Sequence, residues 1–212
     1  MAACALPIDA AVGNEDSEPG PKIQACFACH GVDGASTLSQ YPIIAGQEEY
    51  YLYVQLRDFQ AGRRESAEMT PMVQSMTKEE MQAIAKYFSQ QAWPKLQQRA
   101  DPAQVAVGMR AAAAGQCPQC HLGGYDGNSR VPRLAGQYPE YLEKTMLDFK
   151  NRTRNNAPDK GALLRSFSND DIQALAHYIG SLTVYRSAAG SEIGPPAAAP
   201  AAVSPPRAPP VP

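Results

Sequence analysis

A five-residue pattern, Cys-x-x-Cys-His, occurs twice in this chain of 212 residues, at residues 26–30 and at residues 117–121. Two thiols one helical turn apart can each bond a vinyl group of a porphyrin, and the adjacent imidazole can then bind the iron. The pattern is the attachment site of a c-type haem. Random placement of five cysteines and three histidines would give only about 0.002 copies, so two copies are not coincidence. We therefore predict two covalently attached haem c groups.

The predicted attachment residues are Cys26, Cys29, Cys117 and Cys120, and the predicted proximal iron ligands are His30 and His121. Two other functions use the Cys-x-x-Cys spacing, namely thiol redox chemistry and structural zinc binding. The first needs a thioredoxin-like βαβ context, which this sequence lacks. A four-thiolate zinc site would leave both histidines, at identical offsets, without a role. Haem attachment is therefore the favoured interpretation.

The second half of the chain repeats the first at an offset of 90 to 91 residues. The matched segments are Pro-x-x-Ala-Gly-Gln at 42–47 and 132–137, Tyr-Leu at 51–52 and 141–142, and Asp-Phe at 58–59 and 148–149. Each half ends in a segment of helical period that follows a capping hydroxyl, Thr77 or Ser168, with an acidic residue three positions on. Because no segment shows sustained β alternation, we predict an all-α fold in which each half is a unit of three to five helices around its porphyrin.

The predicted organisation has five parts: an N-terminal extension (1–18), a first haem domain (19–92), a linker (93–100), a second haem domain (101–186) and a tail (187–212). Asp101 and Pro102 open the second domain as N-cap and first helical residue. The tail is rich in Pro and Ala with little to bury, so it is predicted to be disordered. A helical unit of about 85 residues is marginal by itself, and a haem supplies part of the missing apolar core.

The charge balance and hydropathy of the chain limit the kinds of partner that it can bind. The chain has 19 Lys and Arg against 21 Asp and Glu, which argues against nucleic-acid binding. Haem propionates add negative charge and favour redox partners with basic docking faces. No stretch approaches the roughly 18 apolar residues of a membrane span. Residues 1–12 lack the charged and apolar regions of a secretory signal, which we expect to have been removed upstream, and Cys4 resembles a lipidation site only faintly.

These segments together resemble the dihaem cytochrome c4 family over about residues 20–185. The resemblance implies two class I cytochrome c domains, packed face to face about a pseudo-twofold axis with their haem edges close. It implies a periplasmic location, since haem is attached to thiols outside the bacterial cytoplasm. It also implies that the carbonyls of Pro42 and Pro132 accept the second N–H of the proximal imidazoles, which would orient the rings.

The sixth iron ligand of the first haem is expected to be a methionine, because a thioether there raises the potential. Met69 and Met72 both lie in the loop before the terminal helix. The register of the family places the ligand eight residues ahead of the N-cap Thr77, at Met69. Met69 is favoured and Met72 is the alternative.

The second half departs from the family at this position. The same count back from Ser168 gives Lys160, and no methionine follows Met146. Lys160 could bind iron as a neutral amine in a buried pocket, and it is the favoured ligand. His177, Met146 and an open iron remain as alternatives. Nitrogen ligation would set the potential of the second haem below that of the first.

The resemblance implies an electron carrier and not an enzyme. It would pass single electrons from a quinol-oxidising complex or a periplasmic dehydrogenase to a terminal oxidase, and peripheral contact with a membrane stays open. One alternative is the electron-accepting subunit of a thiosulfate or sulfide dehydrogenase. Another is a dihaem enzyme, either a peroxidase or a thiosulfate dehydrogenase, because the second methionine is missing.

Overall fold

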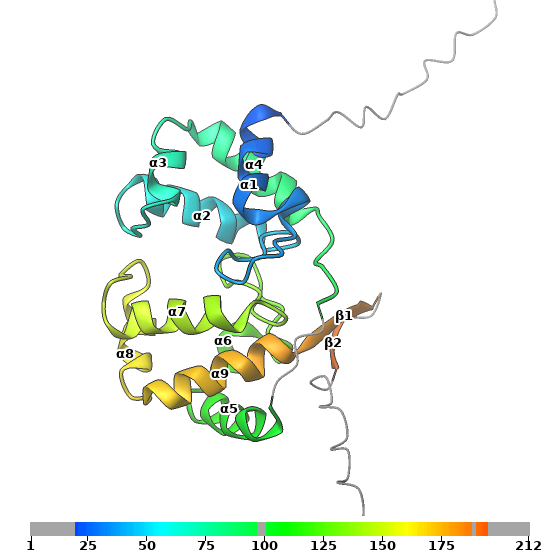
Figure 1. The fold of residues 1–212 in the computed structure, drawn as a ribbon, viewed down its shortest axis with the longest axis vertical. Helices are drawn as coiled ribbons and strands as arrows, with labels where there is room; N and C mark the ends of the chain where they lie inside the picture. The colour runs from blue at the N-terminus through cyan, green and yellow to red at the C-terminus, as the bar shows by residue number, and fades with distance from the viewer. Residues whose placement is uncertain (1–19, 97–100, 188–189, 195–212) are drawn as a thin grey trace, which may run out of the picture.

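A computed structural model describes residues 20–96, 101–187 and 190–194, which form two helical domains and a short hairpin (Figure 1). The first domain contains α1 (Pro21–His30), a 3-10 turn η1 (Val32–Gly34), α2 (Glu49–Gln60), α3 (Met69–Val73) and α4 (Lys78–Ser89). The second contains α5 (Pro102–Ala114), α6 (Cys117–His121), α7 (Pro139–Lys150), α8 (Pro158–Leu164) and α9 (Asn169–Ser181). The predicted tandem helical fold is confirmed.

A two-stranded hairpin follows the second domain, where the sequence analysis expected no strand. Strands β1 (Thr183–Ser187) and β2 (Gly190–Gly194) pair antiparallel, so regular structure continues past residue 186. β1 opens with Thr-Val-Tyr, residue types that favour strands, but five residues are too few to show alternation. The N-terminal extension, residues 97–100 of the linker, Cys4 and residues 195–212 of the predicted tail lie outside the described residues.

The helix starts follow the predicted capping pattern. The hydroxyl of Thr77 accepts the N–H of Glu80 at 3.2 Å, and that of Ser168 accepts the N–H of Asp171 at 3.0 Å. Both carboxylates bond back to the backbone of the cap residue, which completes a capping box at α4 and at α9. The terminal helix of each domain therefore begins at the residue that the sequence predicts.

The two domains differ in the position that supplies a buried aromatic ring to the core. Gly34 has φ 82°, and a Cβ there would lie 2.8 Å from the ring of Phe88. The equivalent residue in the second domain is Tyr125, which is fully buried at φ 54°, and the equivalent of Phe88 is the smaller Ile179. The core of the second domain is thus filled from the loop, and that of the first from the terminal helix. A tyrosine with positive φ is uncommon, so the packing of this ring has to offset backbone strain.

Two buried glutamines join the domains reciprocally. Gln47 donates to the carbonyl of Arg133 at 2.9 Å and accepts the N–H of Arg133 at 2.8 Å. Gln137 donates to the carbonyl of Ile43 at 2.9 Å and accepts its N–H at 3.0 Å. Ile43 and Arg133 are equivalent positions of the repeat, so the contacts obey the predicted pseudo-twofold symmetry. Helices α2 and α7 lie on the facing sides of the two domains (Figure 1).

Helix length and polarity bear on membrane insertion. Across the described part of the chain, no helix combines the length and the apolar character that a bilayer crossing demands.

Replacing Gln137 by alanine should weaken this interface. The change removes both partners of the buried Ile43 backbone, and each unpaired group costs about 1–3 kcal/mol. We expect the free energy of unfolding of the holoprotein to fall by about 2–6 kcal/mol in a denaturant titration. The control is Gln173→Ala, because Gln173 is exposed on α9. Equal stability of the two variants would contradict the reciprocal interface.

Candidate functional site

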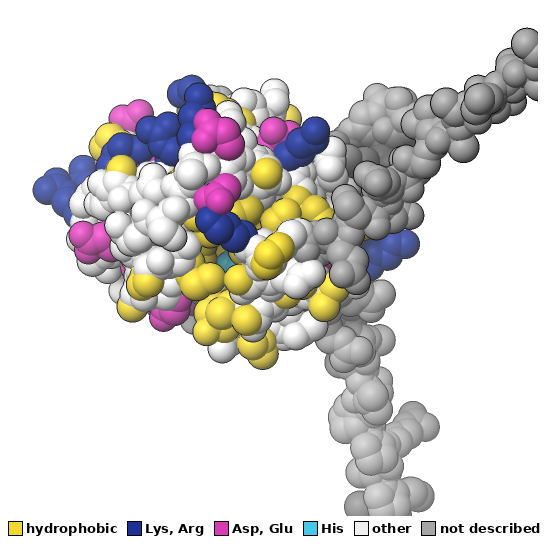
Figure 2. All heavy atoms as spheres, turned by 90° about the horizontal axis from the view of Figure 1, so that it is seen from above, with side chains coloured by type: hydrophobic (Ala, Val, Ile, Leu, Met, Phe, Trp, Pro, Cys, Tyr) yellow, Lys and Arg dark blue, Asp and Glu magenta, His cyan; other side chains and the backbone are white. Residues whose placement is uncertain are grey.

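A single cavity of about 1710 Å³ extends through both domains. The residues that line it include all four predicted attachment cysteines and both predicted proximal histidines: Cys26, Cys29, His30, Cys117, Cys120 and His121. In Figure 2 a histidine side chain is visible at the base of a hollow bordered by hydrophobic side chains. The two copies of the pattern therefore face one shared space.

Both imidazoles are oriented by a proline carbonyl. The Nδ1 atom of His30 lies 2.9 Å from the carbonyl oxygen of Pro42, and that of His121 lies 3.2 Å from the carbonyl oxygen of Pro132. When Nδ1–H donates to a carbonyl, Nε2 is the nitrogen with a lone pair for a metal. These are the contacts that the family resemblance implies.

The electrostatic surroundings keep both imidazoles neutral. Burial lowers the pKa of His30 below its usual value. Burial, together with the nearby charge of Lys160, lowers the pKa of His121 to about 4. A neutral imidazole is the form that binds a metal ion, so neither ring has to lose a proton first.

The thiols do not resemble a redox pair or a zinc site. Burial raises the pKa of Cys26 to about 11 and also raises that of Cys117, whereas redox-active Cys-x-x-Cys motifs have a lowered pKa. The four cysteines are in no disulfide. Within the described ranges, three or more His, Cys, Asp or Glu side chains nowhere gather into a metal-binding group. Both alternatives to haem attachment therefore lack support from the geometry.

The donor set fits haem c. Each half of the cavity has two cysteine thiols beside one neutral imidazole, and thioether attachment of a haem uses this combination. The walls are apolar and repeat between the domains, with Leu52, Phe59 and Ile84 in the first and Leu142, Phe149 and Leu175 in the second. A flat macrocycle with an apolar body would bury its faces against these side chains.

Two methionines lie where the sixth ligand of the first iron was predicted. Met69 begins α3, is half-buried and lines the cavity. Met72, one turn later, also lines it, but its side chain is 43% exposed. Because a ligand must be withdrawn from water toward the iron, the burial supports Met69 over Met72.

Lys160 lies on α8 and faces the second half of the cavity. Its Nζ lies 5.5 Å from the centre of the Phe149 ring. Burial lowers the pKa of Lys160 to about 8, and the charges of Arg154 and Arg64 contribute. Met146 also lines the cavity but packs against the core of the second domain, and His177 is not among the lining residues.

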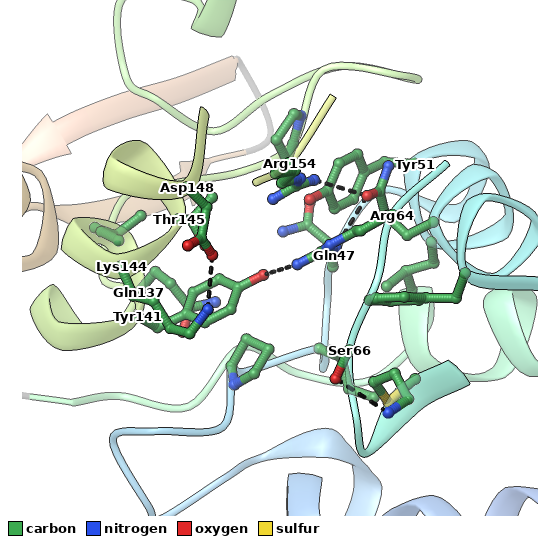
Figure 3. Close-up of a pocket in the computed structure, with 18 of the residues that line it drawn as sticks. Gln47, Tyr51, Arg64, Ser66, Gln137, Tyr141, Lys144, Thr145, Asp148 and Arg154 are labelled. Atoms are coloured by element: carbon green, nitrogen blue, oxygen red, sulfur yellow. Dashed lines mark hydrogen bonds and ion pairs between the residues drawn. The ribbon is translucent and has the colours of Figure 1, made fainter. Parts of the chain in front are cut away.

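Sequence reasoning did not single out an arginine pair at the same cavity. Arg64 and Arg154 line it from opposite domains and lie close to Tyr141 (Figure 3). Their guanidinium carbons lie 4.5 Å and 4.4 Å from the ring centres of Phe59 and Phe149 respectively. The signal that could have found them is their identical spacing, five residues after the repeated Asp-Phe.

Comparison with known proteins agrees with this site. Residues 17–92 match the cytochrome c family. The chain is 35% identical to cytochrome c4 of Stutzerimonas stutzeri, over 79% of this chain and 89% of that protein. It is 31% identical to the thiosulfate dehydrogenase electron acceptor of S. stutzeri strain A1501, over 76% and 81% of the two chains. The crystal structure of reduced recombinant cytochrome c4 from Pseudomonas stutzeri covers 75% of this chain and 94% of its own, with a TM-score of 0.68 and 35% identity.

Removing the second thiol pair should remove one haem. In a host that matures c-type cytochromes, Cys117→Ala combined with Cys120→Ala should yield one covalent haem per chain instead of two, because thioethers form only at cysteines. Haem content per chain and intact mass measure this. The control Cys4→Ala should keep both haems. Two covalent haems in the double variant would contradict the assignment of these thiols.

Proposed function

Because this chain belongs to the cytochrome c4 family, we propose that it carries single electrons between redox proteins of the periplasm. Its cofactors are two covalently attached haem c groups, and it is an electron-transfer cytochrome. The observation that best supports a carrier is that both thiol pairs and both imidazoles line one cavity shared by the two domains. When bound, haem iron supplies a one-electron couple.

Each residue of the site has a role in this proposal. Cys26 and Cys29 would hold the first haem and Cys117 and Cys120 the second. His30 and His121 would be the proximal ligands, and the carbonyls of Pro42 and Pro132 would fix their orientation. Met69 would complete the ligation of the first iron. If these side chains hold each iron on both sides, no position would be left for a substrate, which supports a carrier and not an enzyme.

Lys160 would be the sixth ligand of the second iron. Its place on α8, ahead of the capped terminal helix, corresponds to that of Met69 on α3 in the first domain. His177 does not line the cavity, and Met146, which does, also packs against the core of the second domain, so Lys160 is better placed than either. An amine is a poorer stabiliser of ferrous iron than a thioether, so the second haem would have the lower potential. Electrons entering there would pass downhill to the first.

We propose the electron donors and acceptors by their chemical class. A quinol-oxidising complex or a periplasmic dehydrogenase would supply the electrons, and a terminal oxidase would take them. A specific second candidate is electron acceptance from a thiosulfate dehydrogenase, because the chain resembles a protein named for that role. The exposed apolar residues Met72 and Leu163, at equivalent positions of the repeat, border the cavity and offer a surface to either kind of partner.

The carrier function predicts stoichiometric redox behaviour. The matured protein should accept two electrons per chain in a potentiometric titration and should be reduced rapidly by a partner dehydrogenase. Purified protein given peroxide or thiosulfate alone should show no turnover. Sustained turnover by the isolated protein would instead favour the dihaem enzyme.

The methionine ligand can be tested by comparing two variants. Met69→Ala should abolish the sulfur-to-iron charge-transfer absorption of the first haem and lower its potential, because a thioether favours the reduced iron. The matched control is Met72→Ala, which removes an equivalent side chain one turn away and should leave both properties unchanged. If Met72→Ala abolished the absorption and lowered the potential while Met69→Ala changed neither, Met72 would be the ligand.

The lysine ligand can be tested by converting the second site to the pattern of the first. Lys160→Met should raise the potential of the second haem by about 59 mV or more, a tenfold change in the reduction equilibrium, and should add a second sulfur-to-iron band. Lys78→Met, on the exposed start of α4, is the control and should change neither. A parent protein with two such bands would contradict lysine ligation.

A further inference from the structure

A single peptide unit connects each proximal imidazole to the other domain. The carbonyl oxygen of the peptide between Pro132 and Arg133 lies 3.2 Å from Nδ1 of His121. The N–H of the same peptide donates to the side-chain oxygen of Gln47, in the first domain, at 2.8 Å. A continuous row of hydrogen bonds therefore runs from the proximal histidine of the second domain to a side chain of the first.

The equivalent peptide of the first domain makes the same connection in the opposite direction. The carbonyl oxygen of Pro42 lies 2.9 Å from Nδ1 of His30, and the N–H of Ile43 donates to the side-chain oxygen of Gln137 at 3.0 Å. Each domain thus supplies a glutamine for the histidine of the other. The repeated Pro-x-x-Ala-Gly-Gln segment acts at both ends, because its proline serves its own domain and its glutamine serves the other.

The orientation of both glutamine amides is fixed by their surroundings. The side-chain oxygen of Gln47 also accepts the N–H of Glu48 at 2.9 Å, and that of Gln137 accepts the N–H of Tyr138 at 3.1 Å. Both amide nitrogens donate across the boundary to a backbone carbonyl. A reversed amide would place its NH₂ group against two N–H donors, so only one orientation satisfies the network. Both side chains are buried, so water does not compete for these bonds.

Hydrogen bonds in a row strengthen one another. A peptide whose N–H donates carries more negative charge on its carbonyl oxygen and is a better acceptor. A better acceptor draws the Nδ1–H of the imidazole more strongly and makes Nε2 a more basic metal ligand. A more basic ligand favours ferric iron, which carries one positive charge more than ferrous iron. Each glutamine should therefore lower the potential of the haem in the other domain.

We propose that Gln47 and Gln137 are positioning residues that act crosswise, Gln47 on the proximal ligand of the second haem and Gln137 on that of the first. The inference rests on the two haems of the proposed function, since it concerns their proximal ligands. The effect is reciprocal by linkage: oxidation of one iron strengthens the bond from the glutamine of the other domain. Docking of the domains and the oxidation state of the irons are thereby coupled.

The test compares Gln47→Leu, Gln137→Leu and the control Tyr138→Phe in the matured protein. Gln47→Leu should shift the reduction equilibrium of the second haem about threefold toward the reduced state, or about 28 mV, and leave the first unchanged. Gln137→Leu should produce the same shift at the first haem alone. Tyr138→Phe removes a bond of 2.7 Å across the boundary, from the Tyr138 hydroxyl to the Ser36 carbonyl, without touching either proximal peptide. It should shift neither potential.

The two potentials can be assigned to their haems independently. The variant that lacks both Cys117 and Cys120 should retain only the first haem, so its potential identifies that haem in the parent titration. The crossed pattern distinguishes the proposal from a structural role of the glutamines. A loosened interface would affect both haems in either leucine variant, because both variants disrupt the same boundary.

Amide hydrogen exchange in the parent protein tests the reciprocal effect and requires no variant to fold. The N–H of Arg133 should exchange about threefold more slowly in the oxidised protein than in the reduced protein. The control is the N–H of Glu80, which donates to Thr77 at the start of α4 and should exchange equally in both states.

Three results would overturn the proposal. They are equal shifts of both haems in each leucine variant, parent-like potentials in both folded leucine variants, and exchange of the Arg133 amide that does not depend on oxidation state. Haem content separates these results from failure of the proposed function, which predicts two covalent haems in the parent, in both leucine variants and in Tyr138→Phe.

Discussion

The structure is organised around the large cavity lined by two thiols and an imidazole from each domain, which we propose hold an apolar macrocycle. Protein interiors are packed nearly as densely as organic crystals, and side chains alone do not sustain a cavity of about 1710 Å³. The residues around it make sense as the lining of two haems: paired thiols, neutral imidazoles and repeated leucine and phenylalanine walls. The short helices α3 and α8 and the capped helices α4 and α9 close that lining. The cofactor is thus part of the core of each small domain.

The boundary between the domains is polar, specific and symmetric. Gln47 and Gln137 bond to each other's loops through backbone groups, and Arg64 and Arg154 reach across to side chains. Directional bonds of this kind fix one relative orientation, whereas an apolar interface of similar size would tolerate sliding. A fixed orientation suits a protein that passes electrons between two sites, because it keeps their separation constant. In the proposed ligation the two domains differ at the sixth iron ligand, Met69 in the first and Lys160 in the second, and this difference would set a direction for electron flow.

Much of this could be predicted from the sequence because the strongest constraints are local. The attachment pattern, the caps at Thr77 and Ser168 and the repeat depend on spacing along the chain, and the structure has the predicted elements. Contacts between segments far apart in sequence could not be predicted from the sequence. The buried ring is Phe88 on the terminal helix in the first domain and Tyr125 in a loop in the second. These two positions are not aligned in the repeat, which shows only a glycine replaced by a tyrosine. The arginine pair looks like surface charge until the domains are docked, and the β1–β2 hairpin is too short for a periodic pattern.

The central claim is that the duplicated pattern holds two haems through thioether bonds. Its most direct test is the mass of the matured chain under denaturing conditions, which removes every cofactor that is not covalently attached. The account predicts a mass greater than that of the polypeptide by two haem groups, with an absorption spectrum typical of thioether-linked haem. A chain that retained one haem or none after denaturation would contradict it.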